Sequence, residues 1–177
     1  MYIRSFAGEY PDEVAGLVFV DPADFTETKN DWNDIFRILG LPESRIDEML
    51  TNRLYRESKA DSANFGPWSE LAVLTALRRN DFAEISNLPL PNVPIYFFVG
   101  GKFEVPIERR SKEFDQEAFF HIKNASNMDR WKKLIYSSTE GGALIYLANA
   151  GHYIQWDDPK SLIANIKVLV EGIGDNQ

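Results

Sequence analysis

The segment Ala15–Pro22, which reads AGLVFVDP, decides the class of fold. Its apolar residues from Leu17 to Val20 run together without polar alternation, and Asp21-Pro22 ends the run. Strands buried on both faces have this composition, and they belong to parallel sheets that helices cover. We therefore predict that this segment is a buried strand of an α/β domain.

Two further segments favour strands of the same sheet. One is PNVPIYFFVGG at 91–101, which two prolines introduce and two glycines close, and the other is ALIYLANAG at 143–151. Helical patterns precede or follow them at 2–10, 125–139 and 158–173, and the last carries an apolar stripe of Leu162, Ile166, Leu169 and Val170. Strands that alternate with helices predict right-handed crossovers and a three-stranded parallel sheet.

The stretch between the first two strands is helical in pattern throughout. Apolar residues recur at helical spacing in DWNDIFRILGLP, in a segment that Ser44 would cap, and in GPWSELAVLTALRR. Such a block is too long for one crossover between neighbouring strands. We expect residues 1–24 to form the first helix and strand of the core, 25–90 a helical cap, and 91–177 the rest of the core.

Composition excludes several classes of function. The 177 residues carry a net charge of −8 and no cysteine. No cluster of Lys and Arg favours binding to nucleic acid or to an anionic membrane surface. The longest apolar runs are too short to span a bilayer, and the N-terminus has no secretory signal pattern, so we expect a cytoplasmic protein. No metal site or cofactor is expected.

His152 is the strongest candidate for chemistry. It follows the third predicted strand in AGHYIQWDDP, at the carboxyl end, where open α/β sheets bind their ligands. Asp21 and Glu104 follow the first and second strands, so either carboxylate could orient the imidazole as a general base. The chain lacks G-x-S-x-G; Ser5 has no flanking glycines, and His121 stands in an aromatic stretch that favours a packed or partly exposed side chain.

These segments together resemble a known family. YIRSFAGEYPDEVAGLVFVDP resembles the region directly after the nucleophile elbow of α/β-hydrolases, VPIYFFVGG their next strand, and AGHYIQWDDPKSLIANI their Gly-His loop and last helix. The resemblance covers essentially the whole chain, with the cap least specific. It implies a partial α/β-hydrolase fold that starts just after the missing G-x-S-x-G and lacks the earlier strands and the oxyanion-hole loop.

The resemblance implies an esterase-like serine hydrolase acting on a small-molecule ester. His152 would be its base, and Asp21 rather than Glu104 its acid, because the subgroup that this chain is most similar to often carries the acid after the earlier strand. Aromatic cap residues, Trp32, Phe36 and Trp68, would pack in the helix core or line the substrate pocket. The isolated chain would be inactive without its serine.

Two alternatives remain open: a non-catalytic binding or remnant domain, and a half that complements a separate elbow-bearing chain. In either case the first strand would present an apolar edge, which favours a homodimer or pairing with another chain, unless the first helix or the cap covers it.

Overall fold

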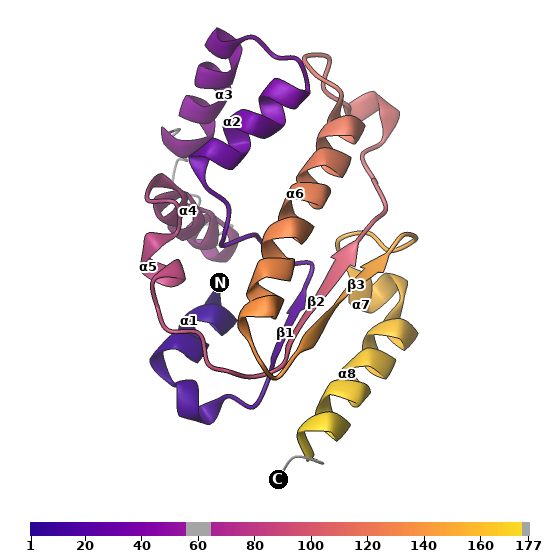
Figure 1. Ribbon diagram of the computed structural model, residues 1–177. Coiled ribbons are helices and arrows are strands. Elements are labelled where there is room, and N and C mark those ends of the chain that lie inside the picture. The colour runs from indigo at the N-terminus through magenta and orange to yellow at the C-terminus, as the bar shows by residue number, and fades with distance from the viewer. Residues whose placement is uncertain (56–64, 175–177) are drawn as a thin grey trace.

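A computed structural model describes residues 1–55 and 65–174 of the chain (Figure 1). Its α-helices are α1 Tyr2–Glu9, α2 Lys29–Ile38, α3 Glu43–Tyr55, α4 Phe65–Arg79, α5 Ala83–Ser86, α6 Gln116–Ser137, α7 Ile154–Asp157 and α8 Pro159–Gly174. Its strands are β1 Leu17–Val20, β2 Ile95–Gly100 and β3 Gly142–Leu147, and short 3-10 turns occupy Pro11–Glu13 and Ile107–Arg109.

The strands form one parallel sheet in the order β1-β2-β3. Leu17 pairs with Ile95, and Ile95 pairs with Gly142, so all three strands run the same way from a common end. The predicted α/β class and the three-stranded parallel sheet with flanking helices are confirmed. The parallel arrangement brings the carboxyl ends of the strands, and the residues that follow them, to one edge of the sheet.

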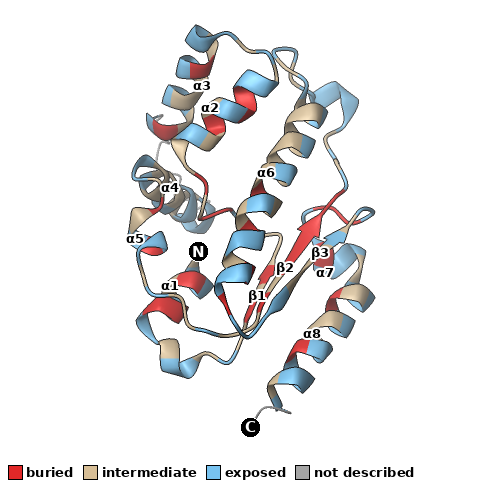
Figure 2. Ribbon diagram, in the orientation of Figure 1, coloured by how far each residue is buried: buried red, intermediate tan, exposed pale blue. Residues whose placement is uncertain are grey.

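The central strand β2 separates two apolar layers, and Figure 2 shows it buried along most of its length. On one face Phe97 stacks on Trp131 of α6, with ring centroids 4.9 Å apart. On the other face Phe98 packs with Ile154 of α7 and Leu162 of α8. The apolar run of PIYFFVGG is thus explained by burial on both faces.

The outer strands are less buried than the continuous apolar pattern predicted. In β1, Leu17 and Phe19 are buried, whereas Val18 and Val20 are only half-buried. The difference follows from position, because an edge strand has a neighbouring strand on one side alone. The backbone N–H groups of Leu17 and Asp21 donate to Pro94 and Phe98, so those of Val18 and Val20 point to the open side.

Between β1 and β2 the described residues form the helices α2 to α5, joined by loops and turns, and no strand among them interrupts the predicted helical pattern. Helices α2 and α3 enclose an apolar cluster of their own, built on Trp32, Phe36 and Ile46, and Phe119 of α6 completes it. Thr28 caps α2 through a reciprocal capping box with Asp31. The predicted Ser44 cap is wrong, because Ile46 N–H already bonds the Pro42 carbonyl and the helix begins at Glu43.

Two flanking helices differ in detail from the pattern. Helix α6 begins at Gln116, well before the predicted start at residue 125, because Asp115 caps it by accepting bonds from the Glu117 and Ala118 amides. In α8, Leu162 and Leu169 are buried, but Val170 is 61% exposed and does not belong to the core face.

Helix α1 leaves most of its apolar stripe in contact with solvent. Ala7 is fully buried, whereas Ile3, Phe6 and Tyr10 are about half exposed. Together with the start of β1, residues of this helix border a hollow of about 520 Å³. Apolar side chains of α1 and of the start of β1 therefore make up most of the lining of this hollow. No helix among the described residues is long and apolar enough to cross a membrane.

Candidate functional site

His152 lies on the turn between β3 and α7, at the carboxyl edge of the sheet. Its side chain is 66% exposed. The turn is held by the Gly151 amide, which donates to the Asp157 carboxylate at 2.7 Å, and by α7, which begins two residues later with buried Ile154. The imidazole is therefore accessible while the backbone that carries it is fixed.

Asp21 meets His152 from the end of β1. Its Oδ2 lies 2.7 Å from Nδ1 of His152, and its Oδ1 accepts a hydrogen bond of 3.1 Å from the Gly100 amide at the end of β2. Groups at the carboxyl ends of all three strands thus meet at the Asp21 carboxylate. Asp21 has a φ of 40°, a left-handed conformation that aspartate and asparagine adopt more readily than most side chains.

The pairing fixes the roles of the ring nitrogens. An ionised carboxylate can only accept, so the neutral imidazole carries its proton on Nδ1 and leaves Nε2 as an acceptor. Within the described residues, Asp21 is the side chain that hydrogen-bonds His152. An exposed Nε2 with a fixed tautomer is equipped to take a proton from an incoming hydroxyl or water.

Glu104, the alternative acid, has a different partner. Its Oε1 pairs with Lys102 Nζ at 2.8 Å, and both side chains are about half exposed. This hydrogen bond raises the pKa of Lys102. The Glu104 carboxylate lies over Gly151, where any side chain would collide with it. The structure therefore brings Asp21, and not Glu104, to His152.

The two glycines after β2 allow the loops of the site to approach. A Cβ on Gly100 would collide with the Gly151 carbonyl, and one on Gly101 would overlap the Tyr146 ring. The amides of Gly101 and Lys102 donate across this contact to the carbonyls of Leu147 and Ala150. The glycines that end the PIYFFVGG pattern thus allow the backbone contact that places the His152 loop beside Asp21.

The other candidate residues lie apart from this pair. Ser5 is half-buried within α1, and its amide continues the helix by donating to Met1. His121 is exposed on α6, where its ring meets Phe120 edge-on. Trp32 and Phe36 are core residues, as expected, and Trp68 is half-buried. Across the part of the chain that the structure describes, no group of three or more acidic, His or Cys side chains could hold a metal ion.

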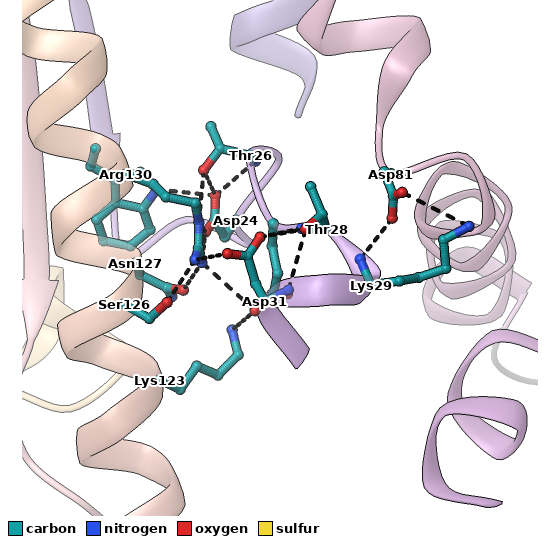
Figure 3. A network of polar contacts seen from close by, with 12 residues as sticks. Asp24, Thr26, Thr28, Lys29, Asp31, Asp81, Lys123, Ser126, Asn127 and Arg130 are labelled. Atoms are coloured by element: carbon teal, nitrogen blue, oxygen red, sulfur yellow. Dashed lines mark hydrogen bonds and ion pairs between the residues drawn. The ribbon is translucent and has the colours of Figure 1, made fainter. Parts of the chain in front are cut away.

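A second polar site, which the sequence did not suggest, lies three residues beyond Asp21. We call Asp24, Thr26, Asp31, Asn127 and Arg130 the buried network (Figure 3). Asp24 Oδ2 accepts from Arg130 Nη2 at 2.7 Å, and its Oδ1 accepts from Thr26 and from the indole of Trp131. Arg130 also reaches Asn127 at 2.7 Å and Asp31 at 3.1 Å.

The buried network joins the loop after β1 to helix α6. It involves residues more than 100 positions apart, which no local pattern reveals. Glu27 extends it, because its buried carboxylate lies 3.2 Å from Lys123 Nζ. Burial raises the pKa of Glu27 and outweighs the opposing effect of Lys123. The network holds the loop that begins with Asp21, so it supports the exposed pair indirectly.

The chain was compared with protein-family models, curated proteins and solved structures, and none of them matches it. The chemical interpretation of the site therefore depends on its geometry.

Proposed function

We propose that this chain forms the later part of an α/β-hydrolase-type serine hydrolase and supplies the base and acid of its triad. The observation that carries the proposal is the 2.7 Å contact between His152 Nδ1 and Asp21 Oδ2 at the carboxyl edge of a parallel sheet. The segment resemblance supports the same assignment, since the base follows the last strand and the acid an earlier one.

In this proposal the reaction is hydrolysis of a small ester. A serine Oγ attacks the carbonyl carbon while its proton passes to Nε2 of His152, and the resulting imidazolium gives that proton to the departing alkoxide. Water repeats the sequence on the acyl-serine and releases the acid. Asp21 holds the imidazole in the required tautomer and stabilises the imidazolium without taking up the proton.

The hydroxyl for this reaction must come from a polypeptide segment other than residues 1–177. The sequence contains no G-x-S-x-G, and the hydroxyl of Ser5 lies on a helix without the glycines of a nucleophile elbow. We therefore expect the chain by itself to hydrolyse esters no faster than a His152→Ala variant, and to gain activity when a segment with an elbow serine is supplied.

The test is to co-express the chain with the polypeptide encoded directly upstream of it, then to assay p-nitrophenyl acetate and to label with a fluorophosphonate. Active pairs should take up one label on a serine of the upstream polypeptide. His152→Ala should abolish labelling and turnover, whereas His121→Ala, which alters the other histidine, should leave both unchanged. An upstream polypeptide without G-x-S-x-G, or a pair that neither labels nor turns over, rejects the proposal.

The open edge of β1 favours a second candidate, a non-catalytic domain that pairs with another chain. The Val18 and Val20 backbone groups point to the open side. Leu17, at the start of the same strand, borders the apolar hollow that Ile3 and Phe6 also line. A two-fold arrangement of two copies would join β1 to β1 in antiparallel fashion and cover both apolar patches at once. Here the function would be assembly, and His152 would have no chemical role.

Light scattering over a range of concentrations tests this candidate. We expect dimers, and we expect Phe6→Glu in the patch to yield monomers. Ile38→Glu is the matched control, because Ile38 is also exposed but lies on α2, away from the edge. A wild-type chain that stays monomeric at all concentrations excludes the homodimer.

A further inference from the structure

The backbone of His152 depends on its neighbours for its position. Its own N–H and C=O groups form no hydrogen bond to the part of the chain that the structure describes, so its polar contact is the one between its ring and Asp21. The turn is anchored on either side of it, by the fully buried side chain of Ile154 and by the buried residue Gly151. The orientation of the imidazole therefore depends on how these two residues are held.

Gly151 is held from several directions. The Glu104 carboxylate lies where a Cβ of Gly151 would be, and the Gly151 carbonyl lies against Gly100. The amide of Gly151 donates to Oδ2 of Asp157 at 2.7 Å. A buried amide needs such an acceptor, because an unpaired donor has lost its hydration and received nothing in return. Asp157 therefore satisfies the backbone group directly before His152.

The carboxylate of Asp157 closes a ring around the His152 turn. The side chain reaches back six positions along the chain to Gly151. The amide of Asp157 donates to the Tyr153 carbonyl at 3.1 Å, and the Trp156 amide donates to the same carbonyl at 2.8 Å. The turn that carries His152 is thus closed by a side-chain bond at its base and tightened by one helical turn.

Asp157 has no other evident task in this region. The next residue, Asp158, caps α8, because its Oδ1 accepts from the Ser161 amide at 3.1 Å. Lys102, the nearby cation, pairs with Glu104 instead. A carboxylate at the C-terminal end of α7 also gains nothing from the dipole of that helix. Among the described residues, the Gly151 amide is thus the hydrogen-bond partner of the Asp157 carboxylate.

We propose that Asp157 is a positioning residue for the pair of His152 and Asp21. By holding the Gly151 amide, it fixes the turn where Nδ1 of His152 lies 2.7 Å from Oδ2 of Asp21. A proton-transferring group must be held within about 0.5 Å of its working geometry. Any consequence for turnover rests on the proposed hydrolase function, whereas the effect on the geometry of the pair does not.

The tautomer of His152 in the chain by itself tests this role, measured from the nitrogen shifts of the ¹⁵N-labelled ring. Asp157→Ala removes the acceptor, so the fraction of neutral imidazole protonated on Nδ1 should fall toward that of Asp21→Asn. Asp157→Asn keeps an acceptor oxygen and should retain most of the wild-type fraction. The proposal is overturned if the alanine variant keeps the wild-type tautomer. It is also overturned if asparagine lowers the fraction as far as alanine does, because the charge of Asp157 would then matter rather than its hydrogen bond.

Asp158→Ala is the matched control. It also removes a carboxylate that accepts from a backbone amide, one residue further on, but that amide belongs to α8. This variant should lower stability through the lost cap and leave the tautomer unchanged. If it shifts the tautomer as far as Asp157→Ala does, a general loosening of the region explains both results and the positioning role is wrong.

Hydrogen exchange in the wild type tests the contact even if Asp157→Ala fails to fold. The Gly151 amide should exchange about tenfold more slowly than the amide of His152, relative to their intrinsic rates, because one hydrogen bond protects it. Equal protection of the two amides contradicts the proposal.

Turnover by an active pair of this chain with an upstream polypeptide extends the test. Asp157→Ala should lower kcat by up to about a hundredfold with a smaller change in KM, because the base is misplaced while the binding surface remains. Asp158→Ala should leave both near the wild-type values. An active pair in which Asp157→Ala keeps the wild-type kcat overturns the positioning role. A wild-type pair without activity rejects the hydrolase function, and the tautomer series then still decides the role of Asp157.

Discussion

Asp21 and Asp24 lie three residues apart in one loop, yet they belong to opposite kinds of site. Asp21 is partly exposed and holds an imidazole that is 66% exposed, whereas the Asp24 side chain is fully buried and its partner Arg130 is 12% exposed. Both partners come from distant parts of the sequence. The first pair can exchange protons with a ligand, whereas the second can only hold the chain in place.

The difference arises from what surrounds each carboxylate. Asp24 accepts from Thr26, Arg130 and Trp131, so its lone pairs are occupied and its charge is matched within the protein. Asp21 has one backbone donor and one histidine, whose second nitrogen is open. A site for chemistry needs such an unoccupied group, and a structural site needs none. Changes at the two aspartates should therefore separate stability from reactivity.

Arg130→Ala should have the largest effect on stability. It leaves Asp24 buried without its cation, which costs roughly 3–5 kcal/mol in the free energy of unfolding. Urea denaturation followed by circular dichroism measures the loss. Lys132→Ala is the control on the same helix, because Lys132 forms an exposed pair with Asp129 and should contribute little. Equal losses in the two variants would contradict the structural role of the buried network.

Glu27→Gln should change how stability depends on pH. The pKa of Glu27 is raised above 4.5 in the folded state, so its contribution to stability is present below that pH and is lost as the pH rises through the folded pKa. The glutamine variant has no such group. As the pH rises from 4.5 through the folded pKa of Glu27, the free energy of unfolding of the glutamine variant should therefore increase relative to that of the wild type. If the difference between the two free energies stays constant over this pH range, Glu27 does not titrate in this way.

Asp21→Asn should leave stability almost unchanged but alter the imidazole. Asparagine tolerates the left-handed backbone at this position, and the imidazole of the pair is 66% exposed, so we expect a loss below about 1 kcal/mol. The asparagine amide can donate to Nδ1, which removes the preference for the proton on that nitrogen. Nitrogen chemical shifts of ¹⁵N-labelled His152 measure the tautomer. A wild-type ring that is already protonated on Nε2 would rule out the role assigned to Asp21.

Glu104→Gln should have the smallest effect of the series. The exposed pair with Lys102 is screened by water, so neither the stability nor the His152 tautomer should change. The residues alone allowed either Glu104 or Asp21 as the acid and the resemblance favoured Asp21, so this variant is the matched control for Asp21→Asn. A tautomer change as large as that of Asp21→Asn would mean that Glu104 acts on His152 as well.

The sheet could be predicted because its signals are local. The apolar runs at 17–20 and 95–100 carry their own evidence of burial, and Gly100-Gly101 marks the end of β2. Patterns were less reliable at helix ends: Asp115 rather than a later residue caps α6, and Ser44 lies inside α3. Val170, which the helical period places on the core face of α8, is exposed in the structure.

The sequence by itself determined the class of fold, the strand order along the chain and the two residue types that could carry chemistry. The residues alone allowed Asp21 or Glu104 as the acid partner of His152, and the resemblance favoured Asp21. Nothing in the sequence indicated that Arg130 pairs with Asp24. Only the tertiary structure decided these pairings, because hydrogen bonds between residues more than 100 positions apart depend on strand register and helix packing. Periodicity determines which face of an element is apolar, but only the assembled sheet determines which loops meet at its edge.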